Sequence, residues 1–564
     1  MSIQETLERI YGAGHASGVA ERLAEVMQRH QRRGEHGGER GSRFSERDVL
    51  LITYGDSLLS SSEPPLATLR GFATRHLGPA VSGIHILPCF PYTSDYGFSI
   101  SDYTRVDPSL GAWGDVTALS HEFRLMLDFV LNHCSRSHAW FQAFLASTRP
   151  FDEFFITQDP AVDLSGVTRP RTSPLLTPFE TARGIQHVWT TFSGDQVDLN
   201  YANPDVLLAM IDVMLTYVDR GADLLRMDAV GYLWKEPGTS CIHLERTHQV
   251  VKLFRQVLDE VAPRVAIVTE TNVPHADNVS YFGNGRDEAQ MVYQFPLAPL
   301  VLHALSTGDA SRLSAWASGL STPSAETTFF NFLASHDGVG VVPARGYLTE
   351  HEVQGLADQV TRHGGQVSYK TNPDGSESPY ELNATFFDAL SDPNEPWATR
   401  LERFICSQAI MLALAGVPGV YLHSLFGSHN NQAGYAASGW KRDLNHERLN
   451  VASLEAELAD PLSEKAQVFA RMMRLLAVRR AQPAFHPNAP QRVLALTPGV
   501  LAIQRGPHAG QTLFALHSTS AHSAGVTLEA LAPSTLVDVL TDQTMGGRRS
   551  LTLAPYGVAW LSTP

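Results

Sequence analysis

Short apolar runs alternate with amphipathic segments along most of this chain, beginning near residue 48. Two of the intervening segments, 204–220 and 244–261, carry apolar residues at helical spacing. The runs that have the pattern of buried strands are 49–54, 84–88, 124–130, 222–226, 265–269, 291–293, 329–334 and 419–422. Short buried strands separated by helices favour a closed barrel over an open sheet. We therefore predict an α/β fold built on a (β/α)8 TIM barrel.

Four departures from this alternation predict additional parts. The interval 135–201 is too long for a simple loop, so we expect a small inserted domain on the catalytic face. Alternating runs indicate a C-terminal all-β domain over 488–564. Residues 1–47 combine a helical apolar stripe with a polar, glycine-rich linker at 32–41, whose charges we expect to be solvated. The barrel would then occupy 48–134 and 202–487, with a second long excursion at 338–396.

The composition narrows the class of protein. A formal net charge of −15 argues against a nucleic-acid partner, although local arginines can still create an anion site inside a pocket. No stretch approaches the roughly 20 apolar residues of a membrane helix, and the first residues lack the pattern of a signal peptide. The four cysteines lie far apart, without zinc spacing. We expect a cytoplasmic protein with reduced thiols and no membrane partner, and a homodimer remains open.

Three acidic residues end separate predicted strands. Asp228 follows Arg226 by two positions, so both side chains point to the same face of the strand, where the guanidinium can hold the carboxylate ionised. Glu270 follows the run 265–269, and Asp337 follows the run 329–334. Because partial burial raises the pKa of a carboxyl group, Glu270 fits a general acid/base, whereas Asp228 fits a nucleophile. Such a trio at the mouth of a barrel predicts a sugar-cleaving site, although most single acids are surface residues.

The same positions resemble the conserved regions of glycoside hydrolase family 13, the α-amylase clan. The segment 128–133, Arg226 to Asp228, Glu270 and the pair 336–337 match its four regions in order. The resemblance implies that Asp228 is the nucleophile, Glu270 the acid/base and Asp337 the transition-state stabiliser. It also implies that three further residues hold the glucosyl unit in the deepest subsite: His133, Arg226 and His336.

Further motifs resemble the sucrose phosphorylase subfamily over roughly residues 48 to 564. They include 95–98, 169–171, 196–198, 228–232, 238–241, 302–308 and 442–445. The resemblance implies a glucose pocket closed by Asp95, which pairs with Arg442, with Phe98 and Phe192 as apolar walls and Gln196 beside them. It also implies phosphorolysis, in which phosphate rather than water attacks a glucosyl-enzyme ester and releases α-glucose 1-phosphate.

Several of these residues also have an ordinary structural explanation. Arg171 and Arg169 could present two guanidiniums to an anion, since arginine forks suit phosphate and carboxylate, or they could pair with acids of their own loop. Tyr232 could line the acceptor side or simply pack. For an isolated phenylalanine such as Phe98 or Phe192, core packing is the commoner explanation.

Two departures from sucrose phosphorylases bear on the leaving group. Asn272 stands where those enzymes have a histidine two residues after the acid/base, and the loop 338–349 differs. The chain length and this loop look more like the glucosylglycerate phosphorylases of the same subfamily. We therefore expect an inorganic-phosphate-dependent enzyme whose favoured small-molecule glucoside is 2-O-α-glucosylglycerate. The carboxylate of glycerate could meet Arg171, Arg169 or Arg345, the last of which we expect to face solvent.

The alternatives are a sucrose or glucosylglycerol phosphorylase, a transglucosylase or hydrolase with the same trio, and a non-catalytic clan member that serves a transporter. Such transporter subunits lose catalytic acids and carry an anchor, whereas this chain keeps all three acids. We expect no cofactor and no metal. Asn132 resembles a calcium-ligand position of amylases, but no full ligand set can be assembled from the sequence.

Overall fold

The computed structural model describes residues 2–30, 43–371, 376–527, 535–545 and 550–563, and of residue 371 it describes the backbone. A closed barrel of eight parallel strands forms its centre, in the order β1-β16-β12-β11-β10-β9-β4-β3. The strands are β1 (Leu50–Thr53), β3 (Gly83–Ile86), β4 (Arg124–Val130), β9 (Ala222–Asp228), β10 (Ala266–Thr269), β11 (Met291–Tyr293), β12 (Thr328–Phe332) and β16 (Val417–Tyr421). The predicted barrel fold is confirmed.

Each barrel strand is short and almost wholly buried because helices cover the outside and side chains fill the inside. The helices α6 (Pro204–Asp219) and α7 (Glu245–Val261) flank β9 and correspond closely to the two predicted helical segments. Asn203 caps α6 by accepting a hydrogen bond from the backbone of Asp205, and Pro204 occupies the first turn. These residues fix the start of the helix that precedes β9, whereas the pairing of β9 with β4 and β10 sets the register of the strand that ends in Asp228.

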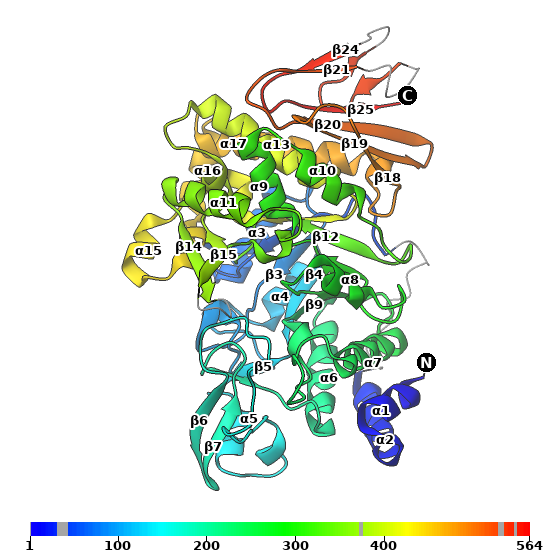
Figure 1. Cartoon of the computed structure of the whole chain (residues 1–564), viewed down its shortest axis with the longest axis vertical. Coiled ribbons are helices and arrows are strands. Elements are labelled where there is room, and N and C mark those ends of the chain that lie inside the picture. The colour runs from blue at the N-terminus through cyan, green and yellow to red at the C-terminus, as the bar shows by residue number, and fades with distance from the viewer. Residues whose placement is uncertain (1, 31–42, 372–375, 528–534, 546–549, 564) are drawn as a thin grey trace.

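The N-terminal hairpin packs on the outside of this barrel. The helices α1 (Ile3–Tyr11) and α2 (Ala13–His30) lie against α6 and α7 (Figure 1). Their buried apolar stripe includes Leu7, Leu23 and Val26, as the helical pattern predicts. Arg22 and Arg29 form ion pairs with Asp205 and Asp212 of α6. The hairpin is thus docked on the barrel, while the predicted linker at 32–41 lies outside the described residues.

Two excursions stand on the catalytic side of the barrel. Between β4 and β9 the chain forms β5 (His133–Ser135), α5 (Ala139–Leu145), β6 (Leu176–Thr181), β7 (Gly184–Trp189) and β8 (Gln196–Asp198). After β12 it forms a three-stranded sheet, β13-β15-β14, from β13 (Val339–Gly340), β14 (Gln366–Thr371) and β15 (Glu377–Asn383), together with α11 (Glu350–Arg362). Both excursions supply residues to the pocket described below.

The C-terminal part is a β structure, at the top of Figure 1. Its six-stranded sheet has the order β18-β19-β20-β25-β22-β23. The strands are β18 (Gln491–Leu494), β19 (Val500–His508), β20 (Gln511–Ser518), β22 (Val537–Asp538), β23 (Gln543–Thr544) and β25 (Val558–Ser562). An all-β C-terminus is therefore confirmed, whereas the residue boundaries predicted for the separate domains stay a prediction. Within the described ranges, no helix is both long enough and apolar enough to cross a membrane.

Candidate active site

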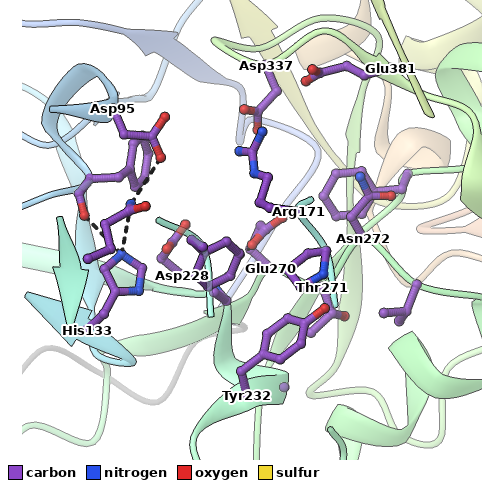
Figure 2. Close-up of a pocket in the computed structure, with 18 of the residues that line it drawn as sticks. Asp95, His133, Arg171, Asp228, Tyr232, Glu270, Thr271, Asn272, Asp337 and Glu381 are labelled. Carbon is purple, nitrogen blue, oxygen red and sulfur yellow. Dashed lines mark hydrogen bonds between the residues drawn. The ribbon is translucent and has the colours of Figure 1, made fainter. Parts of the chain in front are cut away.

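One pocket at the carboxyl end of the barrel brings together all the site residues predicted from the sequence (Figure 2). They are Asp95, Phe98, His133, Arg171, Phe192, Gln196, Arg226, Asp228, Tyr232, Glu270, His336, Asp337 and Arg442. The barrel explains this convergence, since the ends of its strands meet at one face although they lie far apart in sequence. The chemical role of each residue stays a prediction.

The Arg226 guanidinium lies between the acids. Its Nη1 is 2.9 Å from Asp228 Oδ1, and its Nη2 is 3.8 Å from Glu270 Oε2. Asp128 of β4 also binds Nη1, and His85 of β3 holds the other Asp128 oxygen at 2.7 Å. Because Arg226 is 1% exposed, it is fixed by these neighbours rather than by water. The spacing of two residues along β9 therefore places Arg226 and Asp228 on one face, as predicted.

Glu270 is held directly above the turn that follows β9. The backbone N–H of Ala229 donates to Glu270 Oε2 at 3.1 Å, and Ala229 adopts the left-handed conformation at φ 52°. This turn brings the carboxyl end of β10 against the residue that follows Asp228. A hydrogen bond from a backbone N–H and a neighbouring guanidinium both stabilise an ionised carboxylate, so these two contacts oppose the effect of burial on Glu270.

Burial has a larger effect on these acids than the sequence argument allowed. It raises the pKa of Asp228 well above its usual range and raises that of Glu270 as well, against the opposing effect of Arg226. The negative charge of Glu270 also raises the pKa of Asp228, and that of Asp337 raises the pKa of both. Two carboxyl groups that share one guanidinium inside a buried pocket favour a state with one proton between them. This is the division of charge that a nucleophile and an acid require.

Asp337 has a different electrostatic environment. Arg442 Nη1 is 2.9 Å from Asp337 Oδ1, and Nη2 is 3.1 Å from Glu381. Although burial opposes it, the Arg442 guanidinium, together with Arg226 and Arg171, holds the pKa of Asp337 well below its usual range. The expected partner of Arg442, Asp95, lies farther away at 3.9 Å. Asp337 is therefore the acid of the trio whose surroundings favour the ionised form.

A hydrogen-bonded group forms the opposite wall. His133 Nε2 lies 3.0 Å from the Phe98 carbonyl oxygen and 3.2 Å from Gln196 Nε2, and Gln196 donates to Asp95 at 3.0 Å. The Phe98 ring stacks on His336, with centroids 4.8 Å apart. Burial lowers the pKa of His336 to about 3, so the imidazole is neutral. Flat apolar and neutral donor surfaces of this kind suit a sugar ring and its hydroxyl groups.

The cationic side of the pocket is formed by Arg171. Figure 2 shows its side chain extending between Asp337 and Glu270, and its charge contributes to lowering the pKa of Asp337. Among the described residues, no hydrogen bond or salt bridge engages this guanidinium. Its neighbour Arg169 is exposed and does not line the pocket. Arg345 binds Ser378 at 3.0 Å and is only 28% exposed, so the expectation that it faces solvent is wrong.

Known proteins resemble this chain over most of its length. The model for the α-amylase catalytic domain matches residues 75–345. A glucosylglycerate phosphorylase of Allomeiothermus silvanus is 55% identical over 507 residues, which cover 90% of each chain. The chain belongs to the α-amylase family, glycoside hydrolase family 13. A glucosylglycerate phosphorylase of Escherichia coli is 43% identical over 99% of each chain.

More distant members of the α-amylase family share the architecture. A sucrose phosphorylase of Agrobacterium vitis is 30% identical and covers 78% of this chain and 88% of its own. The crystal structure of sucrose 6F-phosphate phosphorylase from Thermoanaerobacter thermosaccharolyticum superposes with a TM-score of 0.74. That structure covers 86% of this chain and 95% of its own at 24% identity, which shows a common fold. Within the family, the curated relatives of high identity are phosphorylases.

Sequence reasoning missed several residues that line or support the pocket. Tyr380 and Glu381 come from β15 in the second excursion, where no strand-end pattern marked them. Burial raises the pKa of Tyr380 to about 12, so its hydroxyl stays protonated. Asp128 belongs to a motif that was recognised, but its support of Arg226 depends on the pairing of β4 with β9. His243 follows the motif 238–241, but no pattern in the sequence indicated that this residue lines the pocket.

The side chain considered as a calcium ligand is engaged by a lysine. Lys235 Nζ lies 2.7 Å from Asn132 Oδ1 and 2.6 Å from Asp198 Oδ2, and Asn132 also donates to Asp198 at 3.2 Å. The Lys235 side chain is 2% exposed and that of Asp198 is fully buried. An ammonium group thus supplies positive charge between these oxygens. The parts of the chain that the structure describes contain no cluster of three His, Cys, Asp or Glu residues able to hold a metal ion.

Proposed function

We propose that this protein is a retaining glucosylglycerate phosphorylase, which converts 2-O-α-glucosylglycerate and phosphate into α-glucose 1-phosphate and glycerate. The relatives of 55%, 47% and 43% identity that carry this activity in their names support the proposal. The observation that carries it in the structure is Arg171, a guanidinium without a hydrogen bond or ion pair among the described residues, which lines the same pocket as the three predicted catalytic acids. A hydrolase needs no cation there, whereas both glycerate and phosphate are anions.

In the first step the Asp228 carboxylate attacks the anomeric carbon and forms an ester as the bond to the glycerate oxygen breaks. Glu270 gives its proton to that oxygen. Arg226 lies closer to Asp228 than to Glu270, so the single proton of the pair resides on Glu270. Once Glu270 is neutral, it no longer raises the pKa of Asp228, and the Arg226 guanidinium at 2.9 Å favours the ionised carboxylate that attacks.

In the second step a phosphate oxygen attacks the anomeric carbon, the ester bond breaks, and Glu270 takes up the phosphate proton. Asp337 stabilises the oxocarbenium-like transition state because its pKa, lowered chiefly by Arg442, keeps it negatively charged. His133, His336 and Phe98 surround the glucosyl ring in this proposal. Arg171 and Tyr232 lie on the acceptor side, where glycerate leaves and phosphate enters in turn.

The decisive experiment compares 2-O-α-glucosylglycerate, sucrose and 2-O-α-glucosylglycerol with and without phosphate, measuring glucose 1-phosphate and free glucose. We expect phosphate-dependent glucose 1-phosphate from glucosylglycerate, with a higher kcat/KM than from the other two donors. Preference for sucrose or glucosylglycerol would replace the donor in this proposal. Release of free glucose that phosphate does not alter would instead identify a hydrolase or transglucosylase.

The cytoplasmic location, the homodimer and the lack of a nucleic-acid partner also belong to this proposal. The net charge of −15 supports the last of these. Cell fractionation and light scattering of the purified protein test the location and the oligomeric state.

A further inference from the structure

The turn at residues 93–99 presents two pocket residues from a strained backbone. Asp95 and Tyr96 have φ 54° and φ 52°, in the left-handed region that residues other than glycine rarely adopt. Gly97 follows with φ 108°, so three consecutive residues have a positive φ. Asp95 and Phe98 line the pocket from this turn. A backbone of this kind persists only where the surrounding structure holds it in place.

The carboxylate of Asp195, in the loop just before β8, contacts both ends of this turn. Its Oδ2 accepts hydrogen bonds from the hydroxyl groups of Thr93 at 2.6 Å and Ser99 at 2.7 Å. The hydroxyl group of Ser94 donates to the same oxygen. Thr93 and Ser94 precede the strained positions 95–97, and Ser99 follows them. One carboxylate oxygen therefore ties the two ends of the turn together.

The charge of Asp195 strengthens these contacts. Although burial opposes it, the hydroxyl groups of Ser94, Thr93 and Ser99 lower the pKa of this carboxyl group, so it is ionised near pH 7. Hydrogen bonds to an ionised carboxylate are roughly twice as strong as those between neutral groups. Arg136 lies 3.5 Å from the other oxygen, but its side chain is 62% exposed, so this ion pair contributes little. The hydroxyl contacts are therefore the main interactions of Asp195.

The next residue along the chain holds the same turn from inside the pocket. Gln196, the first residue of β8, donates from its side chain to Asp95 at 3.0 Å. His133 Nε2 lies 3.0 Å from the Phe98 carbonyl oxygen, and Figure 2 shows Asp95 and His133 on the same side of the pocket. Asp195 and Gln196 thus hold the turn from two directions. A shift of the turn would displace Asp95 and Phe98 together.

We propose that Asp195 is a positioning residue for the glucosyl subsite, because it holds the strained turn in the conformation in which Asp95 and Phe98 meet the glucosyl ring. The inference rests on the proposed function in one respect, that a glucosyl unit occupies this pocket. Asp195 does not line the pocket, so it acts through the turn. Without its carboxylate the strained backbone can relax, and a displacement of about 1 Å at a binding residue can cost about a hundredfold in rate.

The test compares Asp195→Ala and Asp195→Asn with the wild type, in phosphorolysis of glucosylglycerate and in its synthesis from α-glucose 1-phosphate and glycerate. We expect Asp195→Ala to lower kcat/KM for both glucosyl donors by about tenfold or more, and to raise the inhibition constant of glucose against α-glucose 1-phosphate by a similar factor. The KM for phosphate should change little, because phosphate binds after the glucosyl unit has been attached to the enzyme. Asp195→Asn keeps an oxygen acceptor without the charge and should recover part of the loss.

Asp102→Ala is the matched control. Asp102 is also half-buried, accepts a hydrogen bond from the Thr104 hydroxyl group at 2.6 Å and has an arginine, Arg105, at 3.2 Å. These partners lie beyond the turn at 93–99, and Asp102 does not line the pocket. The control should therefore leave both kcat/KM values and the inhibition constant of glucose unchanged.

Unchanged donor kcat/KM values in folded Asp195→Ala overturn the inference, even if Tm falls, since Asp195 would then serve stability alone. A rise in the KM for phosphate as large as the loss in donor kcat/KM also overturns it, because it would show disruption of the whole pocket. Should Asp195→Ala fail to fold, Ser99→Ala removes one of the three hydroxyl contacts, and unchanged donor kcat/KM values in this variant decide against the inference. Failure of the proposed function is distinct, because the wild-type protein itself would then form no glucose 1-phosphate from glucosylglycerate.

Discussion

Replacing Lys235 by methionine tests how the inserted segment is held to the barrel. The Lys235 ammonium is 2.6 Å from Asp198 of β8 and 2.7 Å from Asn132 at the end of β4. Methionine keeps the length of the apolar chain but removes the charge. Asp198 is fully buried, so its carboxylate would remain in the interior without its cation, held only by neutral donors such as Thr191 at 2.9 Å.

The expected loss follows from this burial. Removing one partner of a buried ion pair typically costs about 3–5 kcal/mol, and solvent screening does not reduce it here because both side chains are almost inaccessible. With an unfolding entropy of about 2.1 cal/mol/K per residue, the 564-residue chain would have about 1.2 kcal/mol/K in total. If it unfolds as one unit, a loss of about 4 kcal/mol lowers Tm by about 3 °C.

Differential scanning calorimetry and urea unfolding would measure this loss. The matched control is Lys465→Met, which breaks a 2.7 Å pair with Glu457 whose side chains are 26% and 45% exposed. Exposed pairs contribute at most about 1 kcal/mol, so Lys465→Met should leave Tm within about 1 °C. The double variant Lys235→Met, Asp198→Asn should lose less than the two single losses added together. Equal stabilities of Lys235→Met and Lys465→Met would refute the reasoning.

Three further predictions concern the chemistry. Asp228→Asn should reduce the rate of glucosyl transfer by more than about a thousandfold, because an amide cannot form the ester. The Tm of this variant should change little. Substantial turnover in a discontinuous glucose 1-phosphate assay would show that Asp228 is not the nucleophile. Arg171→Met should raise the KM for phosphate by about tenfold or more and increase the release of free glucose relative to glucose 1-phosphate. Arg169→Met should change neither quantity, because Arg169 is exposed and lies outside the pocket. Equal effects of the two substitutions would count against a contact between Arg171 and phosphate. Because burial raises the pKa of Glu270, the acid form is present below that pKa and is lost as pH rises through it. The kcat/KM for glucosylglycerate should therefore fall on the alkaline side with an apparent pKa above 4.5, and Glu270→Gln should abolish that limb; a limb that persists in this variant would assign it to another group.

The pattern of apolar runs predicted the barrel because each strand lies in a layer covered on both sides, which leaves a continuous apolar signature. It located β4 and β11 at their observed bounds and the others within a few residues. The acids that end β9 and β10 were identifiable for the same reason. In contrast, β15 carries Tyr380 and Glu381 to the pocket from an excursion whose path no local pattern encodes.

The pairings across the pocket also required the tertiary structure. Arg442 was expected to pair with Asp95, but its shortest contact is with Asp337, since Glu381 and Asp337 approach it from two other segments. The environment of Asp228 is a second example. The sequence shows the arginine two residues away, whereas desolvation depends on every segment that closes over the carboxyl group.

The sequence by itself determined the barrel, the order of its strands along the chain and the residue types at their ends. Alternation and spacing are local properties, and they are sufficient for these features. Only the tertiary structure decided which charges meet, which donors stay without a partner and which carboxyl groups lose water. Loops at one end of the closed barrel bring together residues that are hundreds of positions apart in the chain, as with Arg442 and Asp95. Electrostatic energy depends on those distances and on burial, so the final chemistry of the pocket is a property of the folded chain.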